Sequence, residues 1–139
     1  MEFAILVPVF LLLVFGIVDF GHAWYMKHMM SDASREGARY ATRYKTDGSG
    51  HRILPVNLSP TVADYVLQTW DLTSRLPGDA SPTVVPSGAA ATETNVSILA
   101  EEDFIVTINA TKTWFVLGSL IPGFGSSTTL NVTTTMTCE

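Results

Sequence analysis

Two carboxylates bracket a strongly apolar segment at the amino end of the chain. Glu2 directly precedes sixteen nearly all apolar residues, Phe3 to Val18, and Asp19 follows them. A carboxylate buried among apolar side chains is costly unless a cation or hydrogen-bond donors meet it at one defined height. We therefore predict that Glu2 fixes the register in which this segment packs, and that Asp19 marks where a lipid-embedded part ends.

No arrangement of side chains predicts catalysis, cofactor binding or a metal site. The histidines have no cysteine or carboxylate at ligand spacing, and His22 and His28 are six residues apart, so they do not share one helix face. The single cysteine, Cys138, cannot form an internal disulfide, and the sequence does not indicate its role. The net charge of -5 leaves no basic surface for a phosphate backbone. We expect a protein that is not an enzyme and has no nucleic-acid partner.

The apolar segment has three possible interpretations: a cleaved signal peptide, a permanent membrane anchor, or a helix that leaves the membrane to pack against copies of itself. A signal peptide carries Lys or Arg before its apolar core, whereas Glu2 precedes this one. An anchor needs about 20 apolar residues, and sixteen residues at about 1.5 Å each span only about 24 Å of a hydrocarbon core of about 30 Å. The segment is therefore slightly short for an ordinary anchor.

The nearest basic residues all follow the apolar segment. By the positive-inside tendency they would place the rest of the chain in the cytoplasm. A basic leader before Met1 would remove this contradiction by setting the orientation itself, and we expect that such a leader once preceded the segment. The basic residues concerned are Lys27, Arg35, Arg39, Arg43 and Lys45.

Helix-compatible residues continue after the apolar segment, which predicts one long helix over residues 1–45. Phe20, Trp24 and His28 recur at helical spacing, and Tyr25, Met29 and Ala33 make the adjacent stripe, so the second half of this helix is amphipathic. The helix would be about 60 Å long, twice what a bilayer needs, and its carboxyl half could carry a small domain. Pro8 removes one backbone hydrogen bond and predicts a kink or local unwinding.

The remaining residues predict a linker and then a small head. Residues 46–58 are rich in turn formers and predict a linker. Ser59 offers an N-cap and Pro60 a first helical residue, and apolar side chains follow at helical spacing. We therefore predict a short helix from about Pro60 to Leu72, within a head over residues 59–139.

After this helix the apolar period changes to two, which predicts half-buried strands over residues 104–111 and 130–137. A third, weaker strand is predicted around residues 95–100. Together they would form an antiparallel sheet with its apolar face on the long helix and its threonine face toward water or a neighbour. The predicted fold class is thus α+β: a long N-terminal hydrophobic helix plus a head with one short helix and a three-stranded antiparallel sheet.

The connection between the two main strands, residues 114–124, is too apolar for a free loop. Either it folds over the end of the sheet and is buried within the subunit, or it forms a contact between subunits. The candidate contact residues are its large apolar side chains: Trp114, Phe115, Leu117, Leu120, Ile121 and Phe124.

Each asparagine is followed at the second position by Ser or Thr, and is therefore formally a glycosylation sequon. Pro60, just after Ser59, makes the site at Asn57 poor. The candidate glycosylation sites are Asn95, Asn109 and Asn131, the last two on the polar strand face, where a glycan could be accommodated.

Both ends of the chain resemble TadE-type pilins and pseudopilins of tight-adherence pilus systems, within the type IV pilin group. The features that carry the resemblance are Glu-Phe-Ala at residues 2–4, Pro8, Gly16, Asp19, and Ser-Arg-Glu-Gly-Ala-Arg-Tyr-Ala at residues 34–41. The closing residues 102–139 are similar to that family's final pair of strands around an apolar Pro-Gly loop. Family members differ in carrying a basic leader and several apolar residues before the glutamate, and Cys138 departs from their Thr-rich or charged strand end.

The resemblance implies a type IV pilin-like fold and a structural subunit. Such a subunit waits in the bacterial inner membrane, is processed by a prepilin peptidase, and is packed by the pilus assembly machinery into an extracellular homo-oligomeric filament for adhesion or surface attachment. The assembly residues would be Glu2, Pro8, Gly16 and Asp19, with a free amino terminus as the partner of the glutamate. A minor pseudopilin that primes assembly, which the TadE likeness alone favours, and a permanently anchored envelope domain that binds a ligand through its sheet remain as alternatives.

Overall fold

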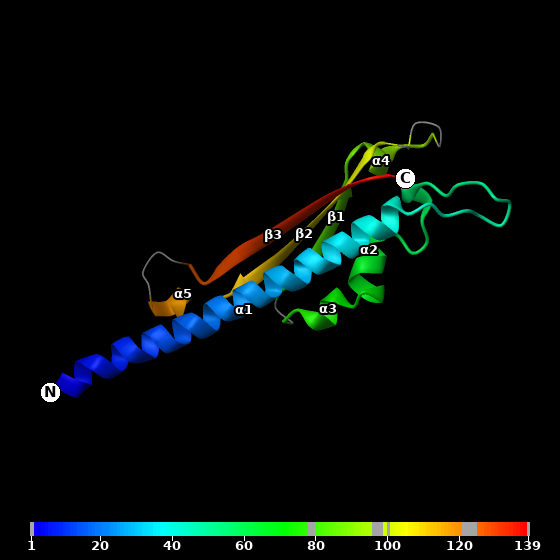
Figure 1. Cartoon of the computed structure of the whole chain (residues 1–139). Coiled ribbons are helices and arrows are strands. Elements are labelled where there is room, and N and C mark those ends of the chain that lie inside the picture. The colour runs from blue at the N-terminus through cyan, green and yellow to red at the C-terminus, as the bar shows by residue number, and fades with distance from the viewer. Residues whose placement is uncertain (1, 78–79, 96–98, 100, 121–124, 139) are drawn as a thin grey trace.

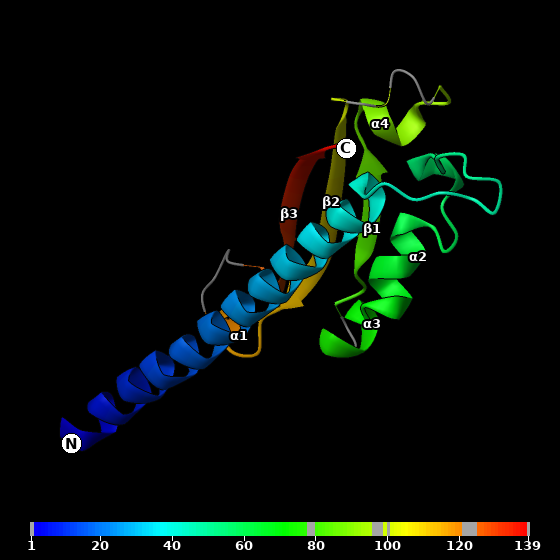
Figure 2. The same cartoon turned by 45° about the vertical axis from the view of Figure 1, so that its right-hand side comes forward.

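The computed structural model describes residues 2–77, 80–95, 99, 101–120 and 125–138. One long helix, α1 (Glu2–Thr42), carries the rest of the chain along its carboxyl half (Figure 1). The sheet lies on one side of α1 and the short helices α2 and α3 on another, while the amino-terminal part of α1 projects away from both (Figures 1 and 2). The predicted α+β class is confirmed.

The helix α1 is continuous through Pro8, so the predicted local unwinding at this residue was wrong. Proline presets a helical φ, and the hydrogen bond that it removes belongs to the first turns of the helix. The side chains from Leu6 to Leu13 are all exposed, and because they are consecutive they cover every side of the helix.

The carboxyl half of α1 is amphipathic, as predicted, and of the two apolar stripes only the second contributes to the buried face, through Ala33 and the partly buried Met29. Phe20, Trp24 and His28 are exposed; the Phe20 ring stacks on Trp24, and Trp24 meets the His28 ring edge to face. The small and flexible side chains pack on the head instead, because they allow the sheet and α2 to approach the helix closely. These buried residues are Met26, Met30, Ala33, Ser34, Gly37, Ala38 and Ala41.

Three antiparallel strands form the sheet in the order β1-β2-β3. The strands β2 (Asp103–Thr113) and β3 (Ser127–Thr137) confirm the two main strands of the sequence analysis and extend them. The third strand was wrongly placed: it is β1 (Thr83–Ser87), and Asn95 and Leu99 lie outside any strand. Pro86 is tolerated in β1 because this strand lies at the edge of the sheet.

The two faces of the sheet have the predicted polarity. Phe104, Val106 and Ile108 of β2 are buried in the core with α1. On the opposite face Thr107 and Thr133 form a cross-strand pair with their hydroxyl oxygens 3.2 Å apart. The strict period of two along β2 therefore separates the core from the threonine-rich outer face.

The predicted single helix from Pro60 to Leu72 was wrong in its start and its continuity. The N-cap is Thr61, not Ser59, because the Thr61 hydroxyl oxygen accepts the Asp64 N–H at 3.2 Å. The chain forms α2 (Val62–Asp64), then a wider π-helical turn, η2 (Tyr65–Thr69). Asp71, at a left-handed φ of 59°, separates this turn from α3 (Leu72–Arg75).

The head also contains η1 (Pro55–Asn57), α4 (Ala89–Thr92) and α5 (Leu117–Leu120), so it has several short helices rather than one.

The predicted linker, residues 46–58, takes part in the core of the head. Asp47 Oδ1 accepts the N–H groups of Ser49 and His51 at 2.8 and 2.9 Å and closes a turn. Leu54 and Leu58, which follow, are buried. The domain boundaries themselves stay a prediction.

Residues 34–41, which carry part of the family resemblance, are the stretch of α1 on which the head docks. Ser34 Oγ lies 2.6 Å from Thr134 Oγ1 of β3. The Tyr65 hydroxyl donates to Glu36 Oε1 at 3.3 Å, and the Tyr40 and Tyr65 rings stack with centroids 4.0 Å apart. Burial and the neighbouring Glu36 carboxylate raise the pKa of Tyr65. This stretch therefore combines polar and aromatic contacts to both β3 and η2.

Gly37 allows the closest approach between α1 and the head. A Cβ atom at this position would lie 2.5 Å from Cγ2 of Val66, a buried residue of η2. Gly21, on the same helix, has no neighbour within 4 Å of such an atom. The two glycines thus offer a matched pair of positions that differ in packing.

We expect Gly37→Ala to destabilise the detergent-solubilised protein, because overpacking costs about 1–3 kcal/mol and exceeds the gain of up to about 1 kcal/mol from helix propensity. Gly21→Ala gains the propensity without the clash and should leave stability unchanged or raise it. Thermal unfolding followed by near-ultraviolet circular dichroism measures both. An equal rise in Tm for the two variants would contradict the close packing at Gly37.

Candidate membrane and assembly site

Asp19 and Lys112 form a buried ion pair between α1 and the end of β2. Each side chain is 1% exposed, and Lys112 Nζ lies 3.3 Å from Asp19 Oδ1. Sequence reasoning missed Lys112, although one signal was present. The alternation Phe104, Val106, Ile108, Ala110 continues to Lys112 on the same face, which places a cation on the apolar side of β2. A cation there requires an anion, and Asp19 provides it.

The Asp19 carboxylate also binds the backbone that follows β2. Its Oδ1 accepts the Phe115 N–H at 3.1 Å, and its Oδ2 accepts the N–H groups of Val116 and Leu117 at 3.0 and 3.3 Å. These donors stand at the start of α5, where helix N–H groups have no partner within the helix. Asp19, from a distant part of the sequence, thus accepts hydrogen bonds from backbone groups that the apolar side chains of the connection after β2 cannot satisfy.

Aromatic rings surround the Lys112 ammonium on its other sides. Lys112 Nζ lies 4.6 Å from the ring centroid of Phe115 and 5.0 Å from that of Trp114, and it also donates to the Thr113 carbonyl oxygen. The two rings therefore stabilise the buried ammonium, since cations are attracted to the faces of aromatic rings.

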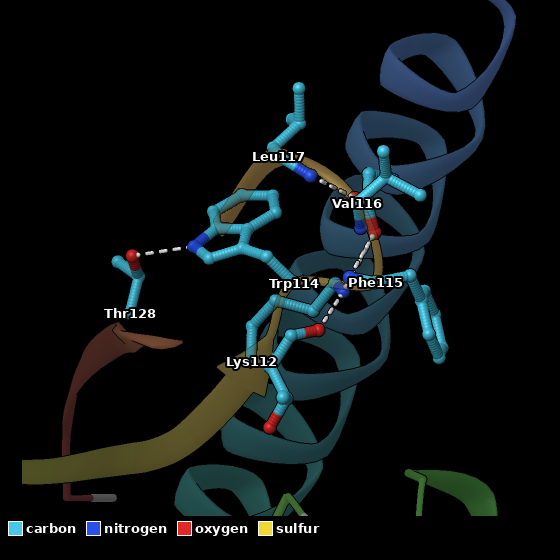
Figure 3. Close-up of polar contacts among 8 residues, drawn as sticks. Lys112, Trp114, Phe115, Val116, Leu117 and Thr128 are labelled. Atoms are coloured by element: carbon cyan, nitrogen blue, oxygen red, sulfur yellow. Dashed lines mark hydrogen bonds and ion pairs between the residues drawn. The ribbon is translucent and has the colours of Figure 1, made fainter. Parts of the chain in front are cut away.

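Further contacts close the apolar connection between β2 and β3 into a compact loop. The Trp114 N–H donates to the Ser126 carbonyl oxygen at 2.9 Å. Its indole N–H donates to the Thr128 hydroxyl at 3.0 Å (Figure 3). Gly118 is required here because a Cβ atom would lie only 2.7 Å from the Gly125 carbonyl oxygen.

This loop packs along α1 on the amino-terminal side of Asp19. Val116 shares an apolar hollow with Pro8 and other side chains of α1, namely Leu11, Leu12 and Phe15. A Cβ atom on Gly16 would lie 3.8 Å from Leu117 Cδ2. Pro8, Gly16 and Asp19, three of the predicted assembly residues, are therefore brought together along one side of α1 beside the loop. Glu2 is the first residue of α1, and its side chain lies outside the described part of the structure.

The predicted contact residues of the loop are partly accessible. Phe115 is 69% exposed, whereas Trp114 and Leu117 are half-buried. Complete burial of this segment within the subunit is therefore excluded for Phe115, which rests one side of its ring on His22 with centroids 5.7 Å apart. Ile121, Phe124 and the side chain of Leu120 lie outside the described residues.

The sequons and the cysteine lie away from this site. Asn109 and Asn131 face each other across β2 and β3, and Asn131 Nδ2 donates to Asn109 Oδ1 at 2.7 Å. Asn95 lies in the connection between α4 and β2, and glycosylation stays a prediction. Cys138 is buried, which raises the pKa of its thiol, and its N–H donates to the Glu102 carbonyl oxygen at 2.9 Å. Its place in the structure is that of a small apolar core residue.

Residues 1–39 match the family model of TadE-like proteins. The matched stretch lies at the amino end of the chain and contains Glu2, Pro8, Gly16 and Asp19, together with nearly all of α1. The match confirms the TadE-type resemblance of the amino-terminal helix. By length and composition, α1 can also cross a membrane. No curated protein and no solved structure matched the chain.

We expect Lys112→Met to destabilise the protein by about 3–5 kcal/mol, because it leaves the Asp19 charge buried without its cation. Lys27→Met, at an exposed position of α1, is the matched control and should change stability by no more than about 0.5 kcal/mol. Denaturant unfolding in detergent, followed by tryptophan fluorescence, measures both variants.

Adding Asp19→Asn to Lys112→Met tests the coupling between the two side chains. The double variant should lose less stability than the sum of the two single variants, because neither charge is then left alone. Additive losses would show that the two charges do not interact and would contradict the ion pair.

Proposed function

We propose that this chain is a pilin-type structural subunit. It is held in the inner membrane by α1, and the pilus machinery then packs it, helix against helix, into an extracellular tight-adherence filament. The observation that carries the proposal is the exposure of the amino half of α1. Its apolar side chains from Leu6 to Leu13 cover every side of the helix, and all of them remain exposed in the single subunit, although Val116 borders some of them. Such a surface needs lipid before assembly and neighbouring helices afterwards.

Transfer of this helix from lipid into a bundle of like helices gains little hydrophobic free energy, because lipid tails are as apolar as Leu side chains. Close packing and polar pairs must therefore set the register between neighbours. Asp19 is paired with Lys112 inside its own subunit, so the register role falls to Glu2. Its partner would be the free amino terminus of a subunit, as the family resemblance implies.

The filament would serve adhesion or surface attachment, and a prepilin peptidase would process the chain before assembly. The principal subunit and a minor, priming subunit are two forms of the same proposal. They differ in how many copies a filament contains.

Electron microscopy of sheared surface filaments, with quantitative mass spectrometry of their subunits, tests the proposal. We expect the chain in the filament fraction, as its main component if it is the principal subunit and in a few copies if it primes assembly. Retention of the whole population in the membrane, with none in any filament, would contradict the proposal and favour a permanently anchored domain.

Glu2→Gln tests the register role directly. We expect the yield of filaments to fall about tenfold or more, because the neutral side chain loses the strong pairing of a buried charge. Insertion into the membrane should be unchanged. Glu101→Gln, which removes one charge at an exposed position of the head, is the control and should assemble normally. Filaments at the unaltered level in the Glu2 variant would exclude this residue as the register mark.

A further inference from the structure

The loop that Asp19 binds lies beside the part of α1 that must be in lipid. The apolar segment Phe3–Val18 contains no charged residue, and in the proposed membrane-held state it is the part of α1 that lies in lipid. Val116 shares a hollow with Pro8, Leu12 and other residues of that segment. The loop therefore reaches the depth of the lipid-embedded helix.

The side chains of the loop suit this position. Trp114, Phe115, Val116 and Leu117 are consecutive and apolar, and Phe115 is 69% exposed. Charge does not oppose insertion here, because the sequence between Lys112 and Glu139 contains no Asp, Glu, Lys or Arg. Trp side chains are enriched where a protein crosses the boundary between hydrocarbon and headgroups.

The backbone of the loop suits this position as well. Irregular backbone enters a bilayer only where its polar groups are satisfied, since each unpaired N–H in hydrocarbon is costly. The N–H groups of Phe115, Val116 and Leu117 are all bound by the Asp19 carboxylate. The charge of that carboxylate is balanced by Lys112.

From these contacts we propose that residues 114–117 form a second membrane-embedded element, inserted beside α1 into the leaflet on the side of the head. The Asp19–Lys112 pair fixes the depth of this insertion. The occupant of the exposed loop surface before assembly is lipid. The inference rests on the membrane-held state of the proposed function but not on polymerisation.

Site-directed labelling of the full chain in lipid nanodiscs tests this proposal. Cys138→Ala removes the native thiol, and each labelled variant then has one cysteine that carries an environment-sensitive fluorophore. The three exposed positions are Phe10→Cys in the span, Phe115→Cys in the loop, and Val85→Cys on the outer face of the sheet. Val85 is 49% exposed and apolar, and is therefore the matched control for Phe115. Quenchers are a nitroxide attached to the lipid acyl chain and iodide in the water.

We expect the Phe115 and Phe10 labels to be quenched several-fold more by the lipid nitroxide than the Val85 label, and the Val85 label to be the one that iodide quenches. A Phe115 label that behaves like the Val85 label, while the Phe10 label is in lipid, would overturn this inference alone. A Phe10 label in water would overturn the membrane-held state as well.

Two further measurements keep the result specific. With one chain per nanodisc the quenching at Phe115 should persist. Quenching at Phe115 that is absent with several chains per nanodisc and appears only on dilution to one chain would identify a second copy of the chain, not lipid, as the occupant and would overturn the proposal. In an unlabelled Trp24→Phe/Trp70→Phe variant, which retains Trp114, brominated lipid should quench the remaining fluorescence, and its failure to do so would likewise overturn the proposal.

Discussion

A carboxylate inside an apolar structure needs partners, and the arrangement of this protein follows from how Asp19 obtains them. Its two oxygens accept from the Lys112 ammonium and from three consecutive backbone N–H groups. These contacts join α1, the end of β2 and the start of α5 at one point. On the carboxyl side of this point α1 carries the sheet and the short helices α2 and α3, and on the amino side it contacts the loop and is otherwise exposed. One buried charge thus holds the head and the apolar helix in a fixed relation.

Because Asp19 is paired within the subunit, Asp19 and Glu2, the two acids that bracket the apolar segment, have different roles. Asp19 is satisfied inside its own chain, so it is a structural residue that positions the loop. The proposed role in packing between subunits then belongs to Glu2, at the far end of the exposed helix. The stretch from Ser34 to Ala41 has a third role, because its Ser, Glu and Tyr side chains contact β3 and η2, and its glycine lets η2 approach closely. The residues of α1 that carry the family resemblance therefore have two roles within the subunit: Asp19 anchors the loop, and the stretch from Ser34 to Ala41 docks the head.

The sequence predicts the parts of the fold that rest on local periodicity. The long helix and the strands β2 and β3 repeat an apolar pattern over many residues, and the structure confirms all three. The strand β1 has five residues, one of them Pro86, and is too short to show alternation. The break at Asp71 depends on one residue in a left-handed conformation. The ion pair joins residues 93 positions apart, so no local pattern contains it, although the place of Lys112 in the β2 alternation indicated that a buried anion must exist.

Asp19 satisfies the backbone N–H groups at the start of the apolar loop. Hydrogen–deuterium exchange of the Phe115, Val116 and Leu117 amides, measured for the bilayer-embedded protein and for its Asp19→Asn variant, tests this claim most directly. We expect slow exchange at these three amides in the unaltered protein and markedly faster exchange in the variant, because their acceptor is weakened. Fast exchange in the unaltered protein, or slow exchange that the substitution leaves unchanged, would contradict it.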